Sequence, residues 1–118
     1  MTVAEAVERI ESIVRTTYTR EEKIFWLSNL DAQIATFILH TTPLEKYKDS
    51  DDLDTELLVG APFDVMYIHW LEAQIAYCNS EIERYNNAIT MYQQDYNAYA
   101  SYYARKKAPE KVTTMKYF

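Results

Sequence analysis

From Phe63 to Lys107 the chain contains neither glycine nor proline. These two residues are the usual markers of turns and strand ends, so a long stretch without them favours helix. The whole chain of 118 residues has only one glycine and three prolines, which indicates few and long elements. We therefore predict an all-α protein whose C-terminal half is dominated by one long helical segment.

Apolar and aromatic residues recur in this segment at alternating steps of three and four. A heptad pattern of this kind is typical of helices that pack along one another. The early members predict a dry core that includes Cys78, whereas the later members are mostly tyrosine, whose hydroxyl needs water or a partner. The tyrosine half is therefore interpreted either as core within one chain or as an assembly surface. The series is Ile68, Leu71, Ile75, Cys78, Ile82, Tyr85, Ile89, Tyr92, Tyr96, Tyr99 and Tyr103.

A continuous helix of about 40 residues would be about 60 Å long, which is more than two short helices can cover. The best place for a break is Asn79-Ser80. Ser80 and Glu83 match a capping box, and asparagine tolerates a left-handed helix end. A continuous helix, with part of its seam covered by another copy or a partner, and a broken helix both remain open.

Two shorter helices are predicted before this segment. The first begins at Thr2, which forms a capping box with Glu5, and the second begins at Thr19, which does the same with Glu22. The second helix should stop near His40, because a proline follows shortly after. The expected buried positions are Val3, Val7, Ile10 and Val14 in the first helix, and Ile24, Leu27, Leu30, Ile34 and Phe37 or Ile38 in the second, where Phe25 and Trp26 widen the buried side.

Residues 1–107 are predicted to form a single small helical bundle, in which the two shorter helices pack on the long one. Within it, residues 41–60 form an acidic connection, and residues 108–118 form a basic C-terminal tail. The formal net charge is −6, which argues against a dedicated nucleic-acid binder. The acidic and basic parts are either solvated surface or patches that meet in a head-to-tail contact between copies.

Motifs that carry catalytic or metal chemistry are missing from the sequence. The acidic run 49–56 does not fit an EF-hand, because no register places a glycine at the sixth position and a glutamate at the twelfth. Neither His40 nor His69 has a second ligand at metal-binding spacing, and one glycine cannot build a phosphate-binding loop. We therefore expect no enzyme activity, no catalytic residue, no cofactor and no metal.

The sequence also bears on membrane insertion, secretion and redox environment. We find no run of about 18 apolar residues and no signal-peptide pattern, so neither a membrane span nor a secreted product is expected. The single cysteine is consistent with a reducing cytosol and is interpreted as a packed core residue.

Two stretches of the sequence resemble a known group of proteins. They are KIFWLSNLDAQI (Lys23–Ile34) and DTELLVGAPFDVMYIHWLEAQIAYCNSEIERYNNAITMYQQDYNAYASYY (Asp54–Tyr103). They are similar to the helical head–tail connector, or adaptor, family of tailed bacteriophages and prophages. The resemblance covers most of Tyr18–Tyr103 but not the C-terminal tail, and it rests on overall pattern rather than on a chemical motif. Family members carry Asn-Gly where this chain has Asn79-Ser80.

The resemblance implies a helical subunit of a ring that lies between the portal and the tail. Such a subunit would assemble in the cytoplasm of the bacterial host and end in the neck of the virion, with portal and neck or tail proteins as partners and DNA at most as passing cargo. Two alternatives remain open, a self-associating helical regulator that forms a dimer and, with less support, a nucleic-acid accessory protein.

The residues predicted to make assembly contacts come from the tyrosine half of the seam, the acidic connection and the basic end of the chain. They are Tyr85, Tyr92, Tyr96, Tyr99, Tyr103, Asp51, Asp52, Asp54, Arg105, Lys106 and Lys107. Trp70 is expected in the core instead.

Overall fold

The computed structural model describes residues 1–14, 18–43, 46–48 and 52–107, and this part of the chain contains four α-helices. They are α1 (Val3–Ile13), α2 (Arg20–Phe37), α3 (Val65–Cys78) and α4 (Ile82–Lys107). The all-α class is confirmed, and so is a long C-terminal helix packed against shorter ones. Among the described helices, none is long and apolar enough to cross a membrane.

The long helical segment is broken at Asn79-Ser80, which settles the question that the sequence leaves open. Ser80 adopts a left-handed conformation with φ of 58°. Its N–H donates to the carbonyl oxygen of Tyr77 at 3.1 Å, and the N–H of Glu81 donates to that of Ala76 at 2.9 Å. These two bonds form a Schellman motif, which satisfies the last carbonyl groups of α3 and reverses the chain.

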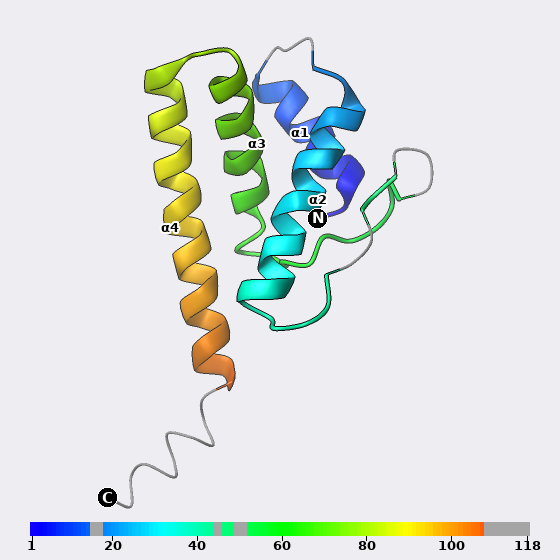
Figure 1. Cartoon of the computed structure of the whole chain (residues 1–118), viewed down its shortest axis with the longest axis vertical. Coiled ribbons are helices and arrows are strands. Elements are labelled where there is room, and N and C mark those ends of the chain that lie inside the picture. The colour runs from blue at the N-terminus through cyan, green and yellow to red at the C-terminus, as the bar shows by residue number, and fades with distance from the viewer. Residues whose placement is uncertain (15–17, 44–45, 49–51, 108–118) are drawn as a thin grey trace, which may run out of the picture.

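The break folds α4 back along α3, so the two halves of the heptad pattern cover each other. The Trp70 and Tyr92 rings lie 4.9 Å apart, and those of Phe63 and Tyr99 lie 5.6 Å apart. Figure 1 shows α3 between α4 and the pair formed by α1 and α2. Of the described helices, α4 packs against α3 alone, so much of its surface faces away from the bundle.

The N-terminal helices begin where their caps predict. Thr2 Oγ1 accepts from the N–H of Glu5 at 3.2 Å, and the Glu5 carboxylate accepts from the N–H of Thr2 at 3.1 Å. Thr19 Oγ1 accepts from the N–H of Glu22 at 3.2 Å, and its hydroxyl donates to the Glu22 carboxylate at 3.3 Å, so only half of the predicted capping box forms here. The predicted apolar positions on the two helices are buried, as Val3, Val7, Ile10, Val14, Ile24, Leu27, Leu30, Ile34 and Ile38.

Two aromatic residues of α2 are exposed, and for Phe25 this contradicts the prediction. Phe37 is 66% exposed, since Ile38 takes the buried position instead. Phe25, which was expected to widen the core, is exposed as well. The ammonium of Lys46 lies 4.6 Å from the centre of the Phe25 ring, so this ring forms a surface cation–π contact rather than core packing.

The acidic connection is fastened to the N-terminus of α1. The N–H groups of Val3 and Ala4 donate to the carbonyl oxygens of Thr55 and Leu53, at 3.0 and 2.9 Å. These donors belong to the first turn of the helix, where N–H groups have no partner within the helix. Further along, Val59 is fully buried, so this part of the connection joins the core.

Two members of the heptad pattern are exposed, which corrects the prediction of a dry core around them. Ile82 is 72% exposed, and Cys78 is exposed too. The chain reverses at Ser80, and a helical period does not continue through such a turn. Cys78 and Ile82 flank the turn and lie where neither helix covers the other.

Candidate functional site

The end of the α3–α4 hairpin carries the two most exposed large apolar side chains of the described residues, on either side of the turn. Tyr77 is 69% exposed and Ile82 is 72% exposed, and the ring of Tyr77 packs on that of Tyr85 at 5.7 Å. Together they border a hollow of about 600 Å³. We call this surface the hairpin tip; it is lined by Ala76, Tyr77, Ser80, Glu81, Ile82, Tyr85 and Asn86.

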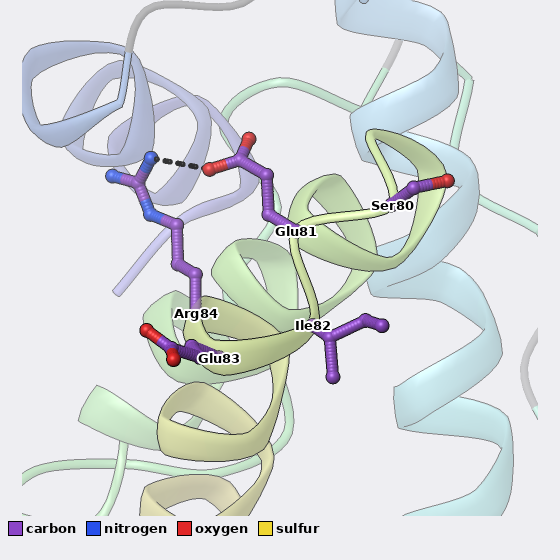
Figure 2. Close-up of a pocket in the computed structure, with 5 residues that line it drawn as sticks. All are labelled: Ser80, Glu81, Ile82, Glu83 and Arg84. Carbon is purple, nitrogen blue, oxygen red and sulfur yellow. Dashed lines mark hydrogen bonds and ion pairs between the residues drawn. The ribbon is translucent and has the colours of Figure 1, made fainter.

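Polar groups at the turn are engaged with one another. The guanidinium of Arg84 lies 3.3 Å from the Glu81 carboxylate and 3.5 Å from that of Glu72. Figure 2 shows the Arg84–Glu81 pair on one side of the turn and the Ile82 side chain directed away from it. The turn thus presents an apolar side chain on one side and, on the other, charged groups that include the exposed Glu83.

The turn is held from the side by the segment that precedes α2. Tyr18 Oη donates to Asn79 Oδ1 at 2.9 Å, and the Tyr18 ring meets that of Trp26 edge-on at 5.8 Å. Trp70 Nε1 in α3 donates to the Trp26 carbonyl oxygen at 3.0 Å. These contacts tie the hairpin to α2, so the exposed tip is a fixed surface rather than a loose end.

A second group of polar side chains is buried at the other end of α3, and we call it the Asp31 cluster (Asp31, Tyr47 and Tyr67). Asp31 is 3% exposed and accepts from Tyr67 Oη at 2.6 Å and from Tyr47 Oη at 2.5 Å. Backbone groups complete the cluster, since the N–H of Leu58 donates to Asp31 Oδ2 at 3.3 Å and that of Val59 to Tyr67 Oη at 2.9 Å.

Burial sets the acid–base behaviour of this cluster. It raises the pKa of Asp31, and the hydrogen bonds from the two tyrosines act in the opposite direction. Burial, together with the neighbouring Asp31 carboxylate, also raises the pKa of Tyr47 and of Tyr67. Because the carboxyl is almost completely enclosed, its role is to clamp the connection onto α2 and α3 rather than to meet a solute.

The predicted tyrosines lie along the inner side of α4. Tyr92 and Tyr99 are each 8% exposed, and burial raises the pKa of Tyr92 to about 12. Tyr85, Tyr96 and Tyr103 are half-buried. In the single chain all of them except Tyr85 lie in or against the hairpin core, as one of the two interpretations of the seam predicts, whereas Tyr85 lines the hairpin tip. The part of these tyrosines in assembly stays a prediction. Trp70, expected in the core, is half-buried against it.

The charged residues predicted at the assembly surface are not brought together in one chain. Asp51 lies outside the described residues, Asp54 is exposed, and Asp52 accepts from the N–H of Lys48 at 2.7 Å. Arg105 and Lys106 are exposed in the last turn of α4, which ends at Lys107. Figure 1 places the connection beside α1 and α2, away from this end of α4.

Sequence reasoning missed the Asp31 cluster and most of the hairpin tip, where Tyr85 is the one predicted contact residue in the lining. The members of the cluster are far apart in the chain, since Asp31 and Tyr67 are separated by 36 positions, so no local spacing reveals them. The one available clue was an aspartate inside the apolar pattern of α2. His69, interpreted as lying beside the seam, pairs through Nδ1 with Asp95 Oδ2 at 2.5 Å across the hairpin.

Within the described ranges, no three His, Cys, Asp or Glu side chains group closely enough to hold a metal ion. Comparisons of this chain with protein families, with curated proteins and with solved structures find no match.

Proposed function

We propose that this chain is a non-enzymatic virion assembly protein, a head–tail connector subunit that forms a ring between the portal and the tail. Its partners are other copies of itself and the portal and neck or tail proteins, and DNA is at most cargo that passes through. It assembles in the cytoplasm of the bacterial host and ends in the virion neck. The resemblance across Tyr18–Tyr103 supports this proposal, and an all-helical fold is compatible with it.

The hairpin tip is the observation that carries the proposal. Soluble chains rarely leave large apolar side chains grouped on a fixed surface unless that surface binds something. Tyr77 and Ile82 are more than two thirds exposed, and the Schellman motif at Ser80 fixes the backbone between them. A preorganised surface loses less conformational entropy when it binds, so such a tip favours recognition of another protein.

The part of α4 that α3 leaves uncovered offers a second surface. Because α4 packs only against α3 among the described helices, residues such as Met91 and Tyr102 remain 46% and 40% exposed. Methionine and tyrosine are both enriched in protein interfaces. A subunit with contact surfaces at the tip and along α4 suits an assembly in which each copy has more than one neighbour.

The shape and mass of the assembled protein test this proposal. We expect light scattering across a range of concentrations to detect a large species, and negative-stain imaging to show closed rings, since head-to-tail contacts that close generate rings. A tight twofold dimer at all concentrations would contradict the connector function and favour the self-associating regulator.

The alternative nucleic-acid function has its own test. The full chain and a variant with Arg105, Lys106 and Lys107 all replaced by glutamate are compared for binding to duplex DNA at low and moderate salt. A connector should bind DNA weakly in both forms. Strong binding that falls steeply with salt and disappears in the variant would favour the nucleic-acid accessory protein.

A further inference from the structure

The hairpin tip combines two properties that restrict what can bind there. Its centre is apolar, with Tyr77 and Ile82 exposed beside a hollow of about 600 Å³. The charged groups beside it are acidic on balance, because Glu72, Glu81 and Glu83 outnumber Arg84. Of these, Glu81 lines the hollow, and Figure 2 shows Glu81, Glu83 and Arg84 on the side of the turn away from the Ile82 side chain. A fitting occupant therefore carries apolar side chains with lysine or arginine close beside them.

The chain itself contains a segment of this composition after α4. Residues 108–118 include the apolar side chains of Val112, Met115, Tyr117 and Phe118, together with two lysines and one glutamate, Glu110. Lys111 precedes Val112, and Lys116 lies between Met115 and Tyr117. Each lysine thus has an apolar neighbour, and the lysines exceed Glu110 by one, which suits an apolar surface with acidic groups close to it.

Distances favour a contact between copies over a contact within one chain. Helix α4 has 26 residues, so its two ends are about 39 Å apart. Phe118 follows Lys107 by eleven residues, which span at most about 40 Å when fully extended. Only a completely stretched segment would bring Phe118 back to Ile82 of its own chain, and Val112 and Met115 would fall short of it.

We propose that residues 108–118 of one copy dock on the hairpin tip of a second copy, with the apolar side chains against Tyr77 and Ile82 and the lysines near Glu81 and Glu83. This inference rests on the proposed assembly function, since it names the contact that joins neighbouring subunits. Because the donor segment and the acceptor surface are different parts of the chain, the contact is head-to-tail and repeats from copy to copy.

Complementation between two variants tests this contact. The tip variant, Tyr77→Ser with Ile82→Ser, keeps its tail and loses its acceptor surface. The tail variant, Lys111→Glu with Lys116→Glu, keeps its tip and loses its donor. Each full-length protein alone is expected to self-associate at least about tenfold more weakly than the unaltered chain, which corresponds to about 1.4 kcal/mol. Mixed in equal amounts, they should form heterodimers and nothing larger, because only one donor and one acceptor remain intact.

The matched control is Phe37→Ser, which removes a side chain that is 66% exposed but lies at the end of α2. It should leave the mass distribution unchanged. Circular dichroism and thermal unfolding of every variant verify that the fold is intact. Sedimentation velocity at low and high salt adds a second readout, since exposed charge pairs weaken as salt is added.

The possible results distinguish a failure of the tail–tip contact from a failure of the proposed connector function. Rings that persist in the tail variant would overturn the contact and leave the connector function standing. Open chains that need both tip and tail would support the contact and count against a ring. An unaltered chain that stays monomeric at every concentration, or a mixture that forms large species, would overturn the contact.

Discussion

The Asp31 cluster and the hairpin tip lie at opposite ends of α3. Both depart from the usual pattern in which charged side chains are exposed and large apolar side chains are buried. In the cluster a carboxyl group is buried, and each of its oxygens accepts a hydrogen bond from a tyrosine. At the tip an isoleucine and a tyrosine are exposed, although the neighbouring polar groups pair with one another. The cluster contributes to the stability of the single chain, whereas the tip contributes little to it and remains available for a partner.

Replacing the carboxyl of the Asp31 cluster should have the largest effect on folding. Asp31→Ala removes the acceptor for two buried tyrosine hydroxyls and for the N–H of Leu58. A buried group left without a partner costs about 1–3 kcal/mol, so we expect the free energy of unfolding in urea to fall by about 3 kcal/mol or more. Asp31→Asn keeps one acceptor oxygen and should lose less. A loss below about 1 kcal/mol for the alanine variant would mean that water replaces the carboxyl.

Protonation of the Asp31 cluster should also make the free energy of unfolding depend on pH. Burial raises the pKa of Asp31 above its ordinary 3.8, so the folded state binds this proton more tightly than the unfolded state. The stability that Asp31 contributes is therefore fully present below pH 3.8 and is lost as the pH rises through the raised pKa. The loss amounts to about 1.4 kcal/mol for every pH unit between the unfolded and the folded pKa.

The measurement is the difference in free energy of unfolding between the unaltered chain and Asp31→Asn, determined at a series of pH values from below 3.8 to neutral. The other carboxylates titrate in both proteins and cancel. We expect the unaltered chain to lose stability relative to the variant with rising pH. A relative gain would show that the hydrogen bonds outweigh burial and lower the pKa.

The backbone of the tip can be made more stable without changing its surface. Ser80 adopts a positive φ, which is unfavourable for a residue with a Cβ atom and natural for glycine. Ser80→Gly should therefore raise the free energy of unfolding by about 1 kcal/mol, while Ser80→Ala should not. An unchanged or lower stability in the glycine variant would show that the serine side chain supports the turn.

Gly60 is the converse of Ser80, because it is a glycine at a position that does not require one. The only glycine of the chain has no positive φ, and a Cβ atom placed on it meets nothing within 4 Å. Gly60→Ala should therefore be neutral or stabilise by up to about 1 kcal/mol, because it restricts the unfolded chain. Thermal unfolding of the two glycine-related variants side by side checks this; a clear loss for Gly60→Ala would contradict the open space at this position.

The exposed side chains of the tip should have the smallest effect on stability. Tyr77→Ser and Ile82→Ser remove surface that is already 69% and 72% exposed, so each should change the free energy of unfolding by no more than about 0.5 kcal/mol. The same urea titrations measure this. A loss comparable to that of Asp31→Ala would show that the tip is part of the folding core and would remove the contrast between the two regions.

Local patterns in the sequence predicted much of the fold. The capping boxes at Thr2 and Thr19 and the apolar periodicity after them gave the starts and the buried sides of α1 and α2, because a helix is governed by contacts within three or four positions. The absence of glycine and proline after Phe63 indicated the long helical segment for the same reason.

The sequence by itself therefore determined the helical class, the starts of the first helices and the residues of the seam. Tertiary structure alone decided that the seam breaks at Ser80 and closes on itself, that Cys78 and Ile82 are exposed, and that Asp31 meets Tyr47 and Tyr67. The physical reason is distance along the chain. The helical period indicates which face of one helix is apolar. Which other element covers that face, and which part of the face stays exposed, depends on where the chain turns.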